Sequence, residues 1–111
     1  MKIELAKTEI IHFVGIGGIG MSGLASIMKG LGFYVQGSDI SLNKNIERLK
    51  KKNIKIHIGH NKKNINNSTI LVTSSAIKKS NPEVIFANKR RLPIYTRGDM
   101  LDSVNELDSV G

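Results

Sequence analysis

The chain has 111 residues, a formal net charge of +8 and no cysteine. That length suits a single domain. The absence of cysteine excludes disulfide bonds, thiolate metal sites and a cysteine nucleophile, and it fits a reducing compartment. The basic residues form short clusters without interleaved aromatic residues, so we interpret them as solvated surface that helps to attract an anionic ligand, and not as a nucleic-acid interface.

The first predicted elements are a strand, a helix and a second strand. Ile10–Val14 is a short apolar run that ends at a glycine, which is typical of a buried parallel strand. Over residues 21–31 apolar side chains recur at helical spacing, and Gly32 stands where such a helix is expected to end. A strand over Phe33–Gln36 follows and leads into Gly37–Asp39.

The middle of the chain predicts a second helix over Lys44–Lys52 and a third strand over Ile54–Ile58, whose apolar residues alternate. Asn61–Ser68 is predicted to be a polar loop. Thr69–Thr73 is the most clearly buried strand after the first.

The last third of the chain predicts a helix, a short strand and a final helix. Ser80 and Glu83 have the spacing of a capping box, and Pro82 suits the first turn of the helix that follows. Leu92–Tyr95 predicts the fifth strand. The final helix is expected over residues 98–107.

Strands that alternate with helices indicate a parallel sheet with right-handed crossovers. We therefore predict one Rossmann-like α/β domain over residues 1–111, with three layers (α/β/α) and about five mostly parallel strands. Such sheets bind ligands at the carboxyl ends of their strands. The segments 15–22, 37–39 and 74–77 fall at such ends and are expected to converge.

One uncharged stretch, residues 10–28, approaches the length of a membrane span. Its five glycines make it a poor span, and the mixed charges before it are not the positive start of a signal peptide. We therefore expect a cytoplasmic protein with no membrane partner.

The glycine-rich loop carries the strongest motif. Gly15-x-Gly17-x-x-Gly20 follows a predicted strand and opens a predicted helix, as the dinucleotide fingerprint requires. Gly15 permits the tight turn, Gly17 and Gly18 let the backbone approach a pyrophosphate, and Gly20 lets the helix pack closely on the sheet. The helix N-terminus then offers N–H groups and positive potential to phosphates.

Further polar groups are expected at the same edge. Asp39 follows Gly20 at the spacing of the acid that holds ribose hydroxyls in nicotinamide-binding proteins, although it could equally cap a turn. Ser74–Ile77 offers hydroxyls and N–H groups to an anion or sugar, unless its serines satisfy their own backbone. His12 is expected to be packed within its strand. His60, at a strand end and without a carboxylate at metal-ligand spacing, could reach the ligand.

Patterns for catalysis and for ATP binding are missing. The sequence has no nucleophile paired with a base, no paired carboxylates and no GxxxxGK[ST] loop. We predict no catalytic residue, no metal site and no nucleoside-triphosphate site in this chain.

The sequence also resembles a known family. Residues 10–101 resemble the start of the Mur ligases of peptidoglycan synthesis. Among these they are most similar to the enzymes that add L-alanine to UDP-N-acetylmuramate. The resemblance is carried by the segments HFVGIGGIGMSGLA, GSD, VTSSAI, NPE and RGDML. The resemblance implies a three-domain ligase of which this chain is the UDP-sugar-binding domain. ATP, Mg²⁺ and L-alanine would bind to the missing domains, so this chain alone is expected to hold no cofactor and to be inactive.

The resemblance also implies where the UDP-sugar lies. The glycine loop would hold its diphosphate through the backbone, the GSD segment would lie near the nucleotide, and the serine loop on the substrate side. His60 matches a position that is often histidine in relatives, and Arg97 could pair with a phosphate. The implied site residues are Gly15, Gly17, Gly18, Ile19, Gly20, Met21, Ser22, Ser38, Asp39, His60, Ser74, Ser75, Ala76, Ile77 and Arg97.

Two other functions stay open at this point. The fingerprint and the spacing of Asp39 alone favour an NAD(P)-binding domain of an oxidoreductase or regulatory protein. The doubled glycine and the SSAI segment favour the ligase. A nucleic-acid-binding module is the third hypothesis, and it predicts steeply salt-dependent binding.

Overall fold

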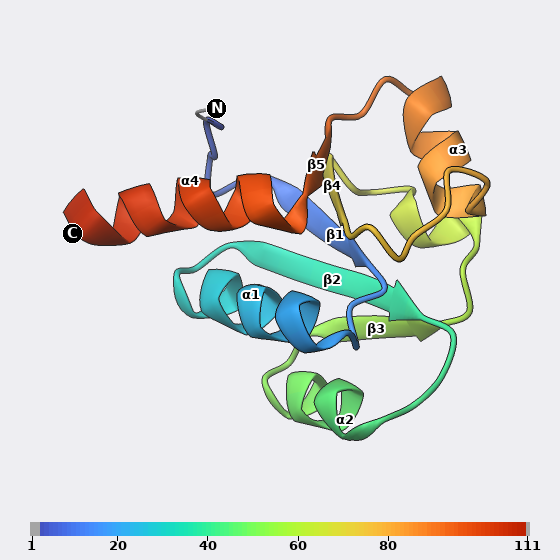
Figure 1. The fold of residues 1–111 in the computed structure, drawn as a ribbon, viewed down its shortest axis with the longest axis horizontal. Coiled ribbons are helices and arrows are strands. Elements are labelled where there is room, and N and C mark those ends of the chain that lie inside the picture. The colour runs from blue at the N-terminus through green and yellow to red at the C-terminus, as the bar shows by residue number, and fades with distance from the viewer. Residues whose placement is uncertain (1–2, 111) are drawn as a thin grey trace.

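A five-stranded sheet forms the centre of the computed structural model, which describes residues 3–110 and the side chains of residues 3–105 (Figure 1). The strands are β1 (Ile10–Val14), β2 (Tyr34–Asp39), β3 (Lys55–Ile58), β4 (Ile70–Thr73) and β5 (Ile94–Thr96). Their order is β3-β2-β1-β4-β5, and every neighbouring pair runs parallel. The predicted α/β class and five-stranded sheet are confirmed.

Helices cover both faces of this sheet. They are α1 (Ile19–Gly30), α2 (Lys44–Lys51), α3 (Pro82–Lys89) and α4 (Arg97–Val110), with a short 3-10 helix η1 (Lys62–Ile65). Apolar side chains of α1, α2 and α4 share one core with Ile11 and Phe13 of β1. Side chains of α3 and η1 share a smaller core with Val14 and Leu71 on the other face. These two cores give the predicted three-layer, Rossmann-like arrangement.

β1 lies at the centre of the sheet and is buried on both faces, as its apolar run predicts. Its side chains alternate between the two cores, so His12 lies on the same face as Val14. His12 is fully buried, as expected for a packed strand histidine. Val14 pairs with Ser38 of β2, which brings a second buried polar side chain to this face.

Helix boundaries differ from the predicted ones by a few residues. α1 begins at Ile19, two residues before the predicted start, and Gly32 follows its end with a φ of +97°, a conformation that favours glycine. The predicted polar loop contains η1, which begins after Asn61 because that side chain accepts a hydrogen bond from the N–H of Lys63. α4 begins at Arg97 and continues past the predicted end.

The predicted capping box of Ser80 and Glu83 is wrong. Asn81 caps α3 instead, because its side-chain oxygen accepts the backbone N–H of Glu83 at 2.9 Å. Pro82 occupies the first helical turn, as predicted. The carboxylate of Glu83 is fully buried and turns to hydrogen-bond donors in the interior.

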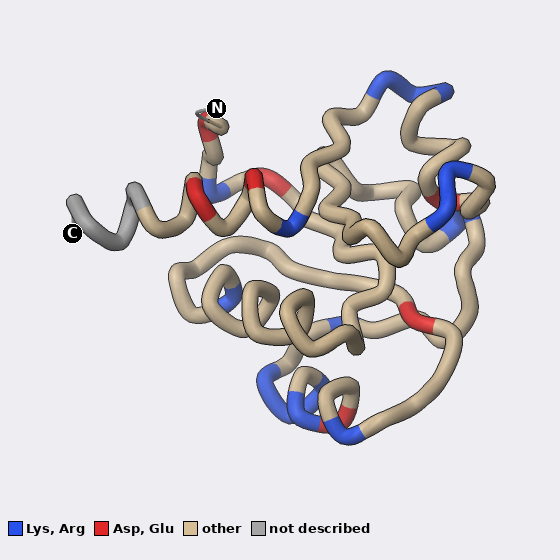
Figure 2. The backbone as a smooth tube through the Cα atoms, in the orientation of Figure 1, with Lys and Arg blue, Asp and Glu red and all other residues tan. Residues whose placement is uncertain are grey.

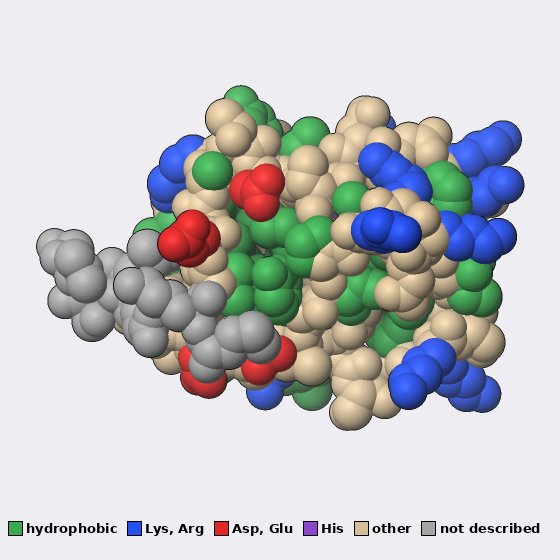
Figure 3. Space-filling view, turned by 90° about the horizontal axis from the view of Figure 1, so that it is seen from above, with side chains coloured by type: hydrophobic (Ala, Val, Ile, Leu, Met, Phe, Trp, Pro, Cys, Tyr) green, Lys and Arg blue, Asp and Glu red, His purple; other side chains and the backbone are tan. Residues whose placement is uncertain are grey.

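The charges are distributed unevenly over the molecule. Lysine and arginine mark α2 and the loops on either side of α3 (Figure 2). In the space-filling view most of the visible basic side chains lie at the end toward which the strands point, and the acidic ones lie nearer α4 (Figure 3). The carboxyl ends of the strands therefore lie in a positive environment. Between residues 3 and 110, no helix is both long and apolar enough to cross a membrane.

Candidate ligand-binding cleft

A cleft of about 350 Å³ lies at the carboxyl ends of β1, β2 and β4. The three predicted segments converge there, although they are far apart in the sequence. The predicted site residues that line the cleft are Gly15, Gly17, Gly18, Met21, Asp39, His60, Ser74, Ala76 and Ile77. The remaining six, which do not line it, are Ile19, Gly20, Ser22, Ser38, Ser75 and Arg97.

The first turn of the glycine loop is tied to β2. The N–H groups of Gly15 and Ile16 both donate to the carbonyl oxygen of Ser38, at 2.9 and 3.0 Å. Gly15 has a φ of +79°, and a Cβ there would lie 3.0 Å from Ile77. Glycine is required here because the backbone is left-handed and the serine loop packs directly against it.

The packing of the loop itself requires glycine at position 17. Its N–H donates to the Asp39 carboxylate at 2.8 Å. A Cβ on Gly17 would lie 2.8 Å from that same oxygen and 3.0 Å from Ile46. The space beside Gly17 is thus filled by the protein. Glycine at this position lets Asp39 brace the loop.

Gly20 also has a different neighbour from the one expected. The three heavy atoms nearest to a Cβ placed on Gly20 all belong to Arg97, at 2.9 to 3.2 Å. Gly20 therefore allows the first residue of α4, and not the sheet, to approach the start of α1. This contact brings a guanidinium group to a helix N-terminus.

The start of α1 offers free hydrogen-bond donors. Gly18 caps the helix without a side chain, and the first turn contains no acidic residue. The first intrahelical bond joins the N–H of Ser22 to the carbonyl of Gly18. Among residues 3–110, the N–H groups of Ile19, Gly20 and Met21 have no hydrogen-bond partner. With the helix dipole and Arg97 nearby, they are suited to bind an anion.

Asp39 is engaged with the backbone through both of its carboxylate oxygens. One accepts from Gly17, and the other accepts from the N–H of Ile40 at 2.8 Å. Its negative charge lies beside Gly17. An anion is therefore better placed at the first turn of α1 than over Gly17 itself.

A buried carboxylate, Glu83, lies between the sheet and α3. One of its oxygens accepts from His12 Nε2 at 2.7 Å and from the Ser38 hydroxyl at 2.6 Å. The other accepts from the Asn61 N–H at 3.1 Å and the Asn64 amide at 2.7 Å. Burial raises the pKa of Glu83, but the hydrogen bonds from His12, Ser38 and Asn64 outweigh it and lower the pKa to about 2.

His60 connects this buried group to the cleft. Its Nδ1 lies 2.9 Å from the Ser38 hydroxyl and 3.6 Å from Glu83. The sequence revealed no carboxylate near His60, because Glu83 comes from a separate helix. One signal was available: His12 and Ser38 are polar residues on strands that are expected to be buried, and such groups need partners.

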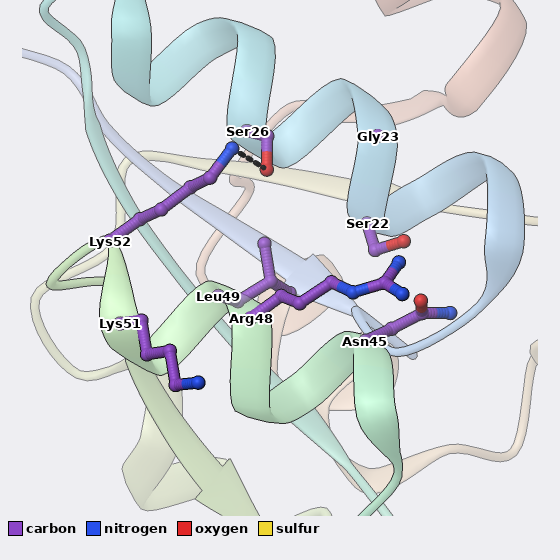
Figure 4. A pocket seen from close by; sticks show the side chains of 8 residues that line it. All are labelled: Ser22, Gly23, Ser26, Asn45, Arg48, Leu49, Lys51 and Lys52. Atoms are coloured by element: carbon purple, nitrogen blue, oxygen red, sulfur yellow. Dashed lines mark hydrogen bonds between the residues drawn. The ribbon is translucent and has the colours of Figure 1, made fainter.

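Ser22 lies in a different hollow, a groove of about 510 Å³ between α1 and α2 (Figure 4). Its hydroxyl donates to the carbonyl of Ile19. Three basic side chains from α2 or its end, Arg48, Lys51 and Lys52, line this groove. The groove is larger than the cleft, yet Ser22 is the one predicted site residue that it contains.

Similarity to known proteins agrees with this geometry. Residues 10–106 match the family model described as "Mur ligase family, catalytic domain". The chain belongs to the Mur ligase family. This confirms the resemblance seen in the glycine loop and in the segments that follow it.

Nearly the whole chain is similar in sequence to individual members of the Mur ligase family. It is 70% identical over 107 residues to the UDP-N-acetylmuramate–L-alanine ligase of Pelagibacter ubique, and 54% identical over 101 residues to that of Bartonella bacilliformis. These matches cover 96% and 91% of this chain but 23% and 21% of the relatives.

A solved structure shows the same fold. The crystal structure of UDP-N-acetylmuramate-alanine ligase from Thermotoga maritima superposes with a TM-score of 0.83 at 35% identity, over 87% of this chain and 23% of that one. The chain thus spans less than a quarter of the length of these ligases.

Proposed function

We propose that this domain binds UDP-N-acetylmuramate for a ligase that uses ATP to join L-alanine to it in peptidoglycan precursor synthesis. The main support is the start of α1, where three free N–H groups lie close to Arg97 at the edge of the cleft. The similarity to ligases with this substrate in their names supports the choice of UDP-sugar.

In this proposal the diphosphate and the uncharged parts of the ligand have different partners. The diphosphate accepts hydrogen bonds from Ile19, Gly20 and Met21, since backbone N–H groups at a helix start favour negative charge. Ile19 can serve only through its backbone N–H, because its side chain is a hydrocarbon without a hydrogen-bond donor. The uncharged part of the ligand lies along the cleft toward His60 and Ser74.

The chemistry of ligation is assigned to the rest of such an enzyme. The sequence has no phosphate loop of the GxxxxGK[ST] type, so ATP, Mg²⁺ and L-alanine are expected to bind outside residues 1–111. In the proposed reaction ATP transfers its γ-phosphoryl group to the muramyl carboxylate, which gives an acyl phosphate and ADP. The amine of L-alanine then attacks the acyl carbon, forms the amide bond and releases phosphate. This domain contributes by holding the UDP end of the substrate and so fixing the position of its carboxylate.

A parallel titration tests the proposal against a nicotinamide cofactor. ¹⁵N-labelled chain is titrated with UDP-N-acetylmuramate and, separately, with NADH, while the backbone amide shifts are followed. We expect the UDP-sugar to move the amides of residues 15–22 at micromolar concentrations. Movement of these amides by NADH, without movement by the UDP-sugar, would contradict the proposal.

A further inference from the structure

Three side chains form a continuous hydrogen-bonded path from the interior to the cleft. Glu83 is fully buried, Ser38 is fully buried, and His60 has 13% of its side chain exposed where it lines the cleft. The Ser38 hydroxyl lies 2.6 Å from Glu83 and 2.9 Å from His60 Nδ1. The direction of each hydrogen bond decides what His60 presents to a ligand.

The protons along this path have one consistent arrangement. One oxygen of Glu83 meets the Asn61 N–H and the Asn64 amide, which only donate, and the pKa of Glu83 is lowered to about 2. The carboxylate is therefore ionised and accepts from every neighbour. Ser38 has a single proton, which points to Glu83 across the shortest distance. The Ser38 oxygen then accepts from His60, which must carry its proton on Nδ1.

The second histidine of the network, His12, has a hydrogen-bond partner at each of its ring nitrogens. The Gln36 amide nitrogen lies 2.7 Å from the carbonyl oxygen of Asn64, which can only accept, so the nitrogen is a donor. The same nitrogen donates to His12 Nδ1 at 2.8 Å. His12 therefore carries its proton on Nε2, where it donates to Glu83. No ring nitrogen of His12 remains for a ligand.

His60 Nε2 is the free atom of the network. It has no hydrogen-bond partner between residues 3 and 105, and no buried side-chain nitrogen or oxygen in that range lacks a partner, so Nε2 is accessible. A ring with its proton on Nδ1 has a lone pair on Nε2. Nε2 can thus accept a hydrogen bond from a group outside the protein, and His60 lines both the cleft and a neighbouring hollow beside α3.

We propose that Glu83 and Ser38 are positioning residues that hold neutral His60 as its Nδ1–H tautomer, so that Nε2 accepts a hydrogen bond from the ligand. The ligand group is then a donor, such as a sugar hydroxyl or a uracil N–H, and not a phosphate. The ligand's identity rests on the proposed function, whereas the tautomer does not.

The experiment records ring ¹⁵N NMR spectra of the 111-residue chain near pH 8, where an ordinary imidazole is neutral. The chain has three histidines, and a His57→Gln variant helps to assign them. We expect His60 to show a protonated Nδ1 and a bare Nε2, opposite to the tautomer that a histidine favours in water. A protonated Nε2 in the free chain would overturn the proposal.

Two serine variants then separate positioning from general stability. Ser38→Ala removes the link to His60, and Ser68→Ala removes another buried hydroxyl of the same network that contacts Gln36 and not His60. We expect Ser38→Ala to move the His60 proton to Nε2 and to weaken UDP-N-acetylmuramate binding about tenfold, the effect of one hydrogen bond. Ser68→Ala should change neither. An unchanged tautomer or affinity in Ser38→Ala would refute the positioning role.

The spectrum of the complex distinguishes the two kinds of ligand group. With bound UDP-sugar, we expect His60 Nε2 to remain unprotonated and to shift as it accepts a hydrogen bond. A ring protonated at both nitrogens would mean that His60 meets a phosphate and would overturn the donor assignment. Failure of the UDP-sugar to bind at all would contradict the proposed function and this ligand contact. The tautomer of His60 would still be tested independently by the spectrum of the free chain.

Discussion

Glu83 should make the stability of the domain depend on acidic pH. Its pKa is lowered from 4.5 to about 2 in the folded chain, so the folded state holds the ionised form more strongly than the unfolded state does. For a carboxyl group whose pKa is depressed, the stabilisation is fully present above the unfolded pKa. It is lost progressively as the pH falls from about 5 toward 2.

The size of this effect follows from the shift. At about 1.4 kcal/mol per pKa unit, the difference between 4.5 and about 2 corresponds to about 3 kcal/mol. A domain of this size is stable by roughly 5 to 15 kcal/mol. Glu83→Gln should cost a similar amount at pH 7, because the amide brings N–H groups into a site where Asn61 and Asn64 already donate.

Urea unfolding followed by far-ultraviolet circular dichroism measures both effects. We expect the wild-type chain to be about 3 kcal/mol more stable than Glu83→Gln at pH 7, and the difference to fall to about half near pH 3 and toward zero at pH 2 and below. Glu47→Gln on the exposed face of α2 is the matched control and should change stability by less than about 0.5 kcal/mol. A difference that stays constant from pH 7 to pH 3 would refute the low pKa of Glu83.

Three further outcomes are expected. Gly17→Ala should weaken UDP-sugar binding at least about tenfold and lower the free energy of unfolding by about 1 to 3 kcal/mol, because its Cβ meets Asp39. The control Gly23→Ala, whose Cβ meets no other atom within 4 Å, should leave binding unchanged. Isothermal titration calorimetry and urea unfolding compare the two variants. Arg97→Gln should weaken UDP binding about threefold to tenfold. Arg48→Gln, in the groove between α1 and α2, should not weaken it. An equal loss of affinity in both variants would mean that only the net charge of the chain matters. The isolated chain should release no phosphate from ATP with L-alanine and UDP-N-acetylmuramate present, as a phosphate-release assay can check.

The elements and the place of the cleft could be predicted because local patterns determine them. The apolar run of β1 and the helical spacing of α1 each reflect burial of a short segment, and the glycine between them marks a turn. Alternating strands and helices then require parallel pairing, which brings the carboxyl ends together. No long-range contact has to be known for these steps.

The hydrogen bonds of Glu83 could not be predicted in the same way. Ser80 and Glu83 match a capping box, which is a rule about neighbours within one turn. The actual partners come from β1, β2 and the segment around η1, and their donors together stabilise the buried carboxylate more than a solvent-exposed cap would. A local rule fails where distant strands place several donors around one carboxylate.

Asp39 shows why the spacing of a motif does not by itself decide what the motif binds. Its distance from the glycine loop in the sequence favours a nicotinamide cofactor, yet both of its oxygens accept from backbone N–H groups of Gly17 and Ile40. The acid at the end of β2 and the glycine loop lie side by side in any sheet of this order, so the carboxylate can accept hydrogen bonds from the loop, from a ribose or from both. Here the N–H of the second glycine, Gly17, points at the carboxylate, so the acid braces the loop whatever the ligand is. The proposal therefore assigns recognition of the ligand to the start of α1 and to His60, and not to Asp39.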